Sequence, residues 1–143
     1  MVTTTDHPAR AMSQRSMDAV GARDKDAWLA LWAEDGWVED PVGVSFIDPG
    51  GLGHHGPEAR AMFWDANIGS TEGIRFDIHD SFAAGNEVAN VATIHITLPG
   101  GTTTRCEGVF VYRLDDAGKL LSLRAFWEMD RMMATMTTVT SSP

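Results

Sequence analysis

Small and apolar residues recur three or four positions apart in the first third of the chain, which is the spacing of one helix face. One such face is formed by Met12, Ser16, Ala19 and Val20. A second face follows Asp24, a residue type that caps helix N-termini, and is formed by Trp28, Leu31 and Trp32. Proline is favoured in the first turn of a helix and glycine after its end, so a third helix is predicted from Pro57 to Gly69.

Extended apolar runs follow the third predicted helix. They span about residues 74–82, 88–98, 102–114 and 120–128, and short turns rich in glycine, asparagine, aspartate or proline separate them. Links this short imply antiparallel neighbours. Three helices followed by a meander predict an α+β fold, in which a strongly curved, mostly antiparallel sheet wraps the helices and leaves an internal apolar cavity.

Composition limits the partners of the chain. At 143 residues with 43% hydrophobic residues, one domain is expected over residues 1–134, with a flexible Ser/Thr-rich tail at 135–143. The net charge of −9 argues against nucleic acid and against anionic membranes. A single cysteine, Cys106, and the lack of an N-terminal apolar core predict a cytoplasmic protein.

The segment Trp37-Val38-Glu39-Asp40-Pro41 places a carboxylate where an apolar run stops. A residue before proline is held extended, and Pro41 has no N–H to continue a strand. Strand alternation turns Asp40 to the side of Val38 and away from Glu39. The pattern fits either a rigidly held inward carboxylate or an aspartate that caps a turn, and the dipeptide alone favours the turn.

Three other groups of residues have weaker implications. His54, His55, His79 and His95 lack the spacing of metal ligands, so no metal is expected. The glycine-rich loop at 44–56 is too apolar to be a simple linker and is expected to cover another part of the fold. The C-terminal methionine group is interpreted as core filler or a flap over the cavity, and consists of Met129, Met132, Met133 and Met136.

Four segments of the chain carry a family resemblance. They are Gln14-Arg15, "WAEDGWVEDPVG", Gly85-Asn86-Glu87 and "YRLDDAGKLLSLRAFW". In these segments and in the order of elements, the chain resembles the ketosteroid isomerases, which are SnoaL-like proteins of the nuclear transport factor two-like superfamily. The resemblance implies a cone of three helices and a curved sheet, a cavity for a steroid or similar flat ketone, no cofactor, and a homodimer formed through the outside of the sheet.

The resemblance also assigns roles to individual residues. Asp40 matches the general base that moves a proton beside the ketone. The two family donors that stabilise the enolate oxygen are absent, since Ser16 stands at the position of the tyrosine and Phe110 at that of the protonated acid. Weak isomerase activity is therefore expected, because loss of one such donor typically lowers the rate about 100- to 1,000-fold.

The expected ligand contacts are Ser16, Trp32, Trp64, Phe110, Tyr112 and Trp127. Tyr112 shares a strand face with Phe110 but lies about 7 Å further along, which is too far for a simple replacement of the acid. Two alternatives stay open at this point. The chain could be a non-catalytic steroid or hydrophobic-ligand binding protein, or an enzyme of polyketide-cyclase type on the same fold.

Overall fold

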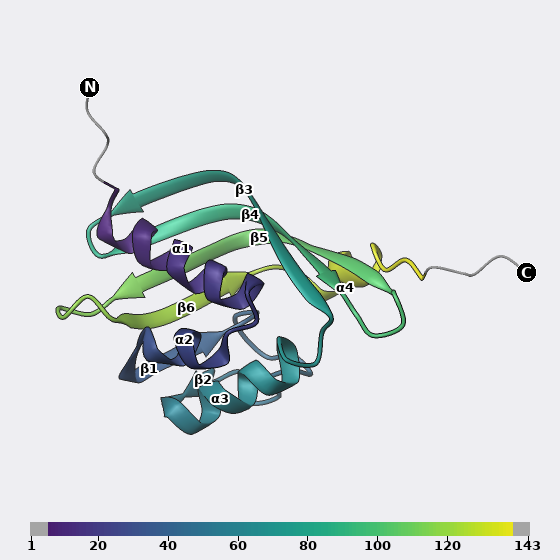
Figure 1. Cartoon of the computed structure of the whole chain (residues 1–143), viewed down its shortest axis with the longest axis horizontal. Coiled ribbons are helices and arrows are strands. Elements are labelled where there is room, and N and C mark those ends of the chain that lie inside the picture. Colours follow the sequence, from purple (N-terminus) through teal and green to yellow (C-terminus); the bar gives the residue numbers. More distant parts are fainter. Residues whose placement is uncertain (1–5, 139–143) are drawn as a thin grey trace, which may run out of the picture.

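The structure is a computed structural model that describes residues 6–138. Its elements in chain order are α1 (Pro8–Gly21), α2 (Lys25–Ala30), β1 (Trp32–Glu39), β2 (His54–His55), α3 (Gly56–Asn67), β3 (Gly73–Ala84), β4 (Glu87–Thr97), β5 (Thr103–Leu114), β6 (Leu120–Phe126) and α4 (Met129–Met133). Figure 1 shows the sheet curving over the N-terminal helices. The predicted α+β cone is confirmed. No helix within residues 6–138 is long and apolar enough to cross a bilayer.

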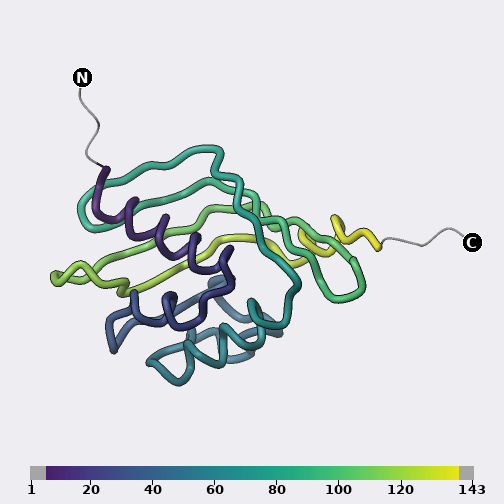
Figure 2. Tube along the Cα trace, in the orientation of Figure 1, coloured from purple at the N-terminus to yellow at the C-terminus, as the bar shows by residue number. Residues whose placement is uncertain are grey.

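One six-stranded sheet carries the fold, in the order β2-β1-β6-β5-β4-β3. All neighbouring pairs are antiparallel except β1 and β6, which run parallel. The predicted meander corresponds to β3–β6, which lie side by side along the trace in Figure 2. Register shifts interrupt the β3–β4 pairing between Ile78 and Asp80, and the β5–β6 pairing where Arg113 and Leu114 face Ser122 and Leu120. Bulges of this kind bend a sheet, which here leaves a hollow face toward the helices.

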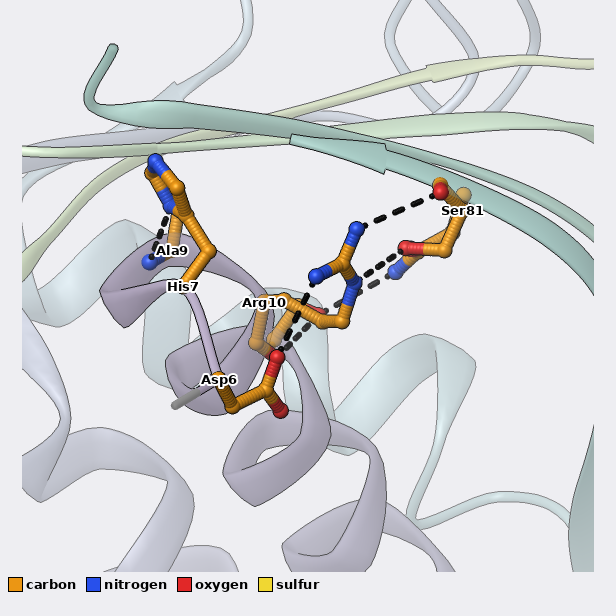
Figure 3. Close-up of polar contacts among 7 residues, drawn as sticks. Asp6, His7, Ala9, Arg10 and Ser81 are labelled. Carbon is orange, nitrogen blue, oxygen red and sulfur yellow. Dashed lines mark hydrogen bonds and ion pairs between the residues drawn. The ribbon is translucent and has the colours of Figure 1, made fainter. Parts of the chain in front are cut away.

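Helix α1 packs against β3, β4 and β5, while α3 packs against β1 and β2. A hydrogen-bonded chain fixes α1 on the sheet. The guanidinium Nε of Arg10 donates to Ser81 Oγ at 3.0 Å, and Arg10 also pairs with Asp6 (Figure 3). Ser81 Oγ donates to the Asn90 amide oxygen at 2.7 Å, and the Asn90 amide nitrogen donates to Ser13 Oγ at 3.1 Å. Ser16, one turn further along α1, is therefore held facing the sheet.

The second helix is shorter than predicted. It ends at Ala30, and Trp32 begins β1. The amide of Leu120 donates to the carbonyl of Leu31 at 2.9 Å, which draws this part of the chain toward β6. The helical prediction for Leu31 and Trp32 was therefore wrong, because pairing with a strand distant in sequence outweighed local periodicity.

The C-terminal end also differs from the prediction. Strand β6 ends at Phe126, and the chain then forms the short helix α4, where the extended run was expected to reach residue 128. Within the predicted tail, Thr137 pairs with Thr103 on β5, and the Thr135 hydroxyl accepts from the Arg105 amide at 2.8 Å. The start of that segment is thus ordered against the sheet. Residues 139–143 lie outside the described residues.

Candidate active site

A cavity of about 440 Å³ lies between the helices and the concave face of the sheet. Every layer of the fold contributes side chains to its wall. They include Ser16 of α1, Trp28, Phe63 of α3, Phe76, Ile94, Cys106, Phe110 and Tyr112 of β3–β5, Leu123 of β6, and Trp127. Most of these side chains are apolar. The wall therefore suits a flat hydrophobic molecule, and among residues 6–138 it contains one carboxylate, that of Asp40.

Strand β1 ends at Glu39, so Asp40 directly follows the strand, whereas it was expected to be the last extended residue. The predicted alternation holds, because Val38 is fully buried while the Glu39 carboxylate turns to the other side and pairs with Arg124 at 2.8 Å. The indole N–H of Trp127 donates to Asp40 Oδ1. Within residues 6–138 no second hydrogen bond to this carboxyl is recorded, which leaves Oδ2 open to the cavity.

Burial changes the acidity of Asp40. Desolvation raises the pKa of its carboxyl from the ordinary value of 3.8 to about 6, and the hydrogen bond from Trp127 limits the rise. The carboxylate is thus a stronger base than an exposed aspartate and is still ionised at neutral pH. A rigid base with these properties can abstract an acidic C–H proton from a bound ketone.

Ser16 of α1 and Tyr112 of β5 meet in the cavity wall. Ser16 is buried, and its Oγ accepts the indole N–H of Trp28 at 3.2 Å. Tyr112 is also buried, and burial raises the pKa of its phenol. The charge of Asp40 raises this pKa further, and hydrogen bonding with Ser16 lowers it. The phenol therefore remains protonated at neutral pH and can act as a donor.

Trp32 and Trp64 do not line the cavity. Both are buried behind Trp28, each with its ring centroid 5.4 Å from that of Trp28, so they support the tryptophan that does line the wall. Arg60 lies over Trp32 at 5.4 Å and donates to the carbonyl of Gly36 at 2.7 Å. Trp28 lines the cavity but was not among the predicted ligand contacts. Its position on the apolar face of α2 could have indicated this role. The prediction extended that helix to Trp32, however, and assigned the ligand contact to Trp32 instead.

Two apolar segments complete the cavity wall. The glycine-rich loop contributes Phe46 and Ile47, which agrees with its expected covering role. The side chains of Met129, Met132, Met133 and Met136 line the wall from α4 and the residues after it. Cys106 lies in the same wall, but burial and the charge of Asp40 raise its thiol pKa, so it is not an activated nucleophile.

The two adjacent histidines have structural contacts. The ring of His54 lies against Phe63 with centroids 5.1 Å apart, and His55 stacks on Trp37 with centroids 5.4 Å apart. His55 also hydrogen-bonds the carbonyl of Leu52 at 2.8 Å. Their contacts tie β2 and the loop to β1.

Comparison with known proteins agrees with this geometry. Residues 13–123 match the family described as the SnoaL-like domain. No curated protein sequence matches the chain significantly. The crystal structure of Δ5-3-ketosteroid isomerase from Mycobacterium sp. is 39% identical, with a TM-score of 0.83 over 92% of this chain and 98% of that chain.

Two further solved structures are similar over almost their whole lengths. RV0760c from Mycobacterium tuberculosis, in complex with estradiol-17beta-hemisuccinate, is 35% identical, with a TM-score of 0.83 over 92% of this chain and 99% of that chain. A computationally designed 17-OHP binder is 34% identical, with a TM-score of 0.83 over 92% of this chain and 98% of that chain. The chain belongs to the SnoaL-like domain family and is a ketosteroid isomerase-like protein.

Proposed function

We propose that the protein binds a steroid or similar flat hydrophobic ketone in the main cavity and that Asp40 moves a proton beside the carbonyl. The observation that carries the proposal is a buried carboxylate, with a pKa of about 6, in the wall of an apolar cavity of about 440 Å³. Solved relatives at 34–39% identity include a ketosteroid isomerase and two steroid complexes or binders, which supports this ligand class.

The proposed reaction begins with the carboxylate of Asp40 removing a proton from the carbon next to the ketone. The electron pair of the broken C–H bond moves to the carbonyl oxygen and forms an enolate. Asp40 then returns the same proton to a second carbon of the conjugated system, so the ketone is isomerised with no net gain or loss of atoms. The N–H of Trp127 keeps Oδ1 fixed, which leaves Oδ2 to exchange the proton.

The rate is expected to be low, because the enolate oxygen needs fixed donors and the cavity has few. Phe110 is buried in the wall and presents a hydrocarbon ring where the resemblance places a protonated acid. Ser16 has only a short hydroxyl at the position of the family tyrosine. This shortage favours a second candidate function, in which the cavity holds a steroid without converting it.

Conversion of an unconjugated steroid ketone to the conjugated isomer separates the two functions, since it produces a strong ultraviolet signal. Wild-type protein is expected to be slow, and Asp40→Asn should lower its rate by at least ~100-fold because it removes the base and keeps the shape. Asp116→Asn, at an exposed turn, is the matched control. Steroid binding without turnover that depends on Asp40 would support the binding protein.

We also propose a homodimer formed through the outer face of the sheet. Register places Phe82, Ala89 and Val111 in one row across this face, and Val91, Val109 and Phe126 in the next. Phe82 is 62% exposed and Phe126 is 44% exposed in the single chain. An apolar patch of this kind on a sheet surface is typical of an interface between copies.

A further inference from the structure

Most polar side chains around the cavity already donate their hydrogen bonds within the protein. The hydroxyls of Ser70 and Thr71 donate to carbonyls of the α3 region, and that of Thr104 donates to the carbonyl of Met132. The indole N–H groups of Trp28 and Trp127 donate to Ser16 and Asp40, respectively. These groups are not free to bind a ketone oxygen.

Tyr112 differs from them, because the hydrogen-bond partner found for its hydroxyl within residues 6–138 is Ser16, whose own proton can make that bond and leave the phenol proton free. It is the single tyrosine of the chain and is 4% exposed. On β5 it faces the cavity beside Phe110, whose side chain shares the same strand face. The charge of Asp40 acts on the phenol, so the two groups share one poorly solvated site.

From this arrangement we propose that Tyr112 donates the hydrogen bond to the carbonyl oxygen of the ligand, with Ser16 and Trp28 as positioning residues behind it. The inference rests on the proposed function, because it names the donor that the proton transfer by Asp40 requires. It relocates the donor from helix α1, where Ser16 now stands, to strand β5.

The short side chain of Ser16 makes this relocation possible. The small side chain of Ser16 leaves space between α1 and β5. The phenol of Tyr112 can occupy this space, since α1 packs directly on β5. The Ser16 oxygen accepts from Trp28, so the serine proton is available for the phenol oxygen of Tyr112. A phenol oxygen that accepts a hydrogen bond is a better donor through its own O–H.

Tyr112 would act without transferring a proton. As Asp40 takes the C–H proton, negative charge moves from the carboxylate to the ketone oxygen, and the O–H of Tyr112 stabilises the oxygen there. The phenol keeps its proton, because burial opposes its ionisation. When Asp40 returns the proton to the second carbon, the charge leaves the oxygen and the hydrogen bond weakens.

The kinetic test compares the wild type with Tyr112→Phe and Ser16→Ala in the ultraviolet isomerase assay. Tyr112→Phe should lower kcat by about 100- to 1,000-fold and change KM much less, because the lost bond is strongest in the transition state. Ser16→Ala should lower kcat by about tenfold through a less ordered phenol. Thr93→Val removes a hydroxyl from the other face of β4, where it bonds His79, and is the control that should leave the rate unchanged.

A second measurement needs no turnover. Tyrosine labelled with carbon-13 at Cζ gives one resonance, because the chain has one tyrosine. A conjugated 3-keto steroid should shift this resonance, and the same steroid lacking the 3-oxygen should shift it much less. Ser16→Ala should change the resonance in the free protein.

The outcomes distinguish this inference from the proposed function. Wild-type turnover that depends on Asp40 and survives Tyr112→Phe would overturn the inference and leave the proposed function intact. A wild type that converts no steroid would overturn the catalytic function, and the resonance would then decide the inference. A shift specific to the ketone would support contact with Tyr112, whereas equal shifts with both steroids, or none with either, would overturn it.

Discussion

Replacing Asp40 by asparagine should stabilise the folded protein at alkaline pH. The carboxyl has a pKa of about 6 in the folded chain and an ordinary value of 3.8, which represents the unfolded chain. Between these two values the folded state binds more protons than the unfolded state, so the stability of the wild type falls as the pH rises through this window. Asparagine is neutral in both states and does not titrate.

The magnitude follows from the two pKa values. Their difference, 6 − 3.8, corresponds to about 3 kcal/mol at 25 °C. The wild type therefore loses up to about 3 kcal/mol between pH 4 and pH 8, and Asp40→Asn should not. For a domain of this size, 1 kcal/mol shifts Tm by about 2–4 °C, so the variant should gain roughly 6–12 °C over the wild type across this range.

Thermal unfolding followed by circular dichroism at pH 4, 5, 6, 7 and 8 measures the effect. The informative quantity is the change with pH in the Tm difference between variant and wild type, because any packing change caused by the amide is common to all pH values. Asp116→Asn, at an exposed turn, should give no such change with pH. A Tm difference for Asp40→Asn that stays constant from pH 4 to pH 8 would refute the reasoning and show that this carboxylate is solvated.

Three further predictions concern the base, the interface and the sheet. The wild-type kcat/KM should rise with pH through a midpoint of about 6. Trp127→Phe should move this midpoint upward, since the indole hydrogen bond lowers the pKa of Asp40, and an unmoved pH–rate profile would contradict the assignment of Asp40 as the base. Phe126→Glu on the outer sheet face should convert a dimer to a monomer in light scattering, whereas Met62→Glu, exposed on α3, should not; a dimer that survives both changes would place the interface elsewhere. Gly108→Ala should destabilise the fold by about 1–3 kcal/mol in urea unfolding, because a Cβ there would overlap the carbonyl of Phe126 and press on Trp127. An unchanged urea midpoint would show that β5 and the end of β6 move apart at little cost.

Local sequence determined much of the architecture. Hydrophobic spacing and turn residues gave α1, α3 and the four-stranded meander, because those elements depend on contacts between residues near in the chain. Pro41 ended the first strand, and alternation turned Asp40 to the side of the buried Val38. These features could be predicted because backbone restrictions and strand periodicity act within a few residues.

Only the tertiary structure decided what surrounds the carboxylate. Strand β6 pairs with β1 and ends α2 early, so that Trp28 lines the cavity and Trp32 supports it from behind. The acidity of Asp40 depends on desolvation by elements distant in sequence. Ser16 and Tyr112 meet because α1 crosses β5, and no spacing along the chain indicates that contact. Periodicity specifies which face of an element is buried, whereas the identity of the partner on that face is set by how the layers pack.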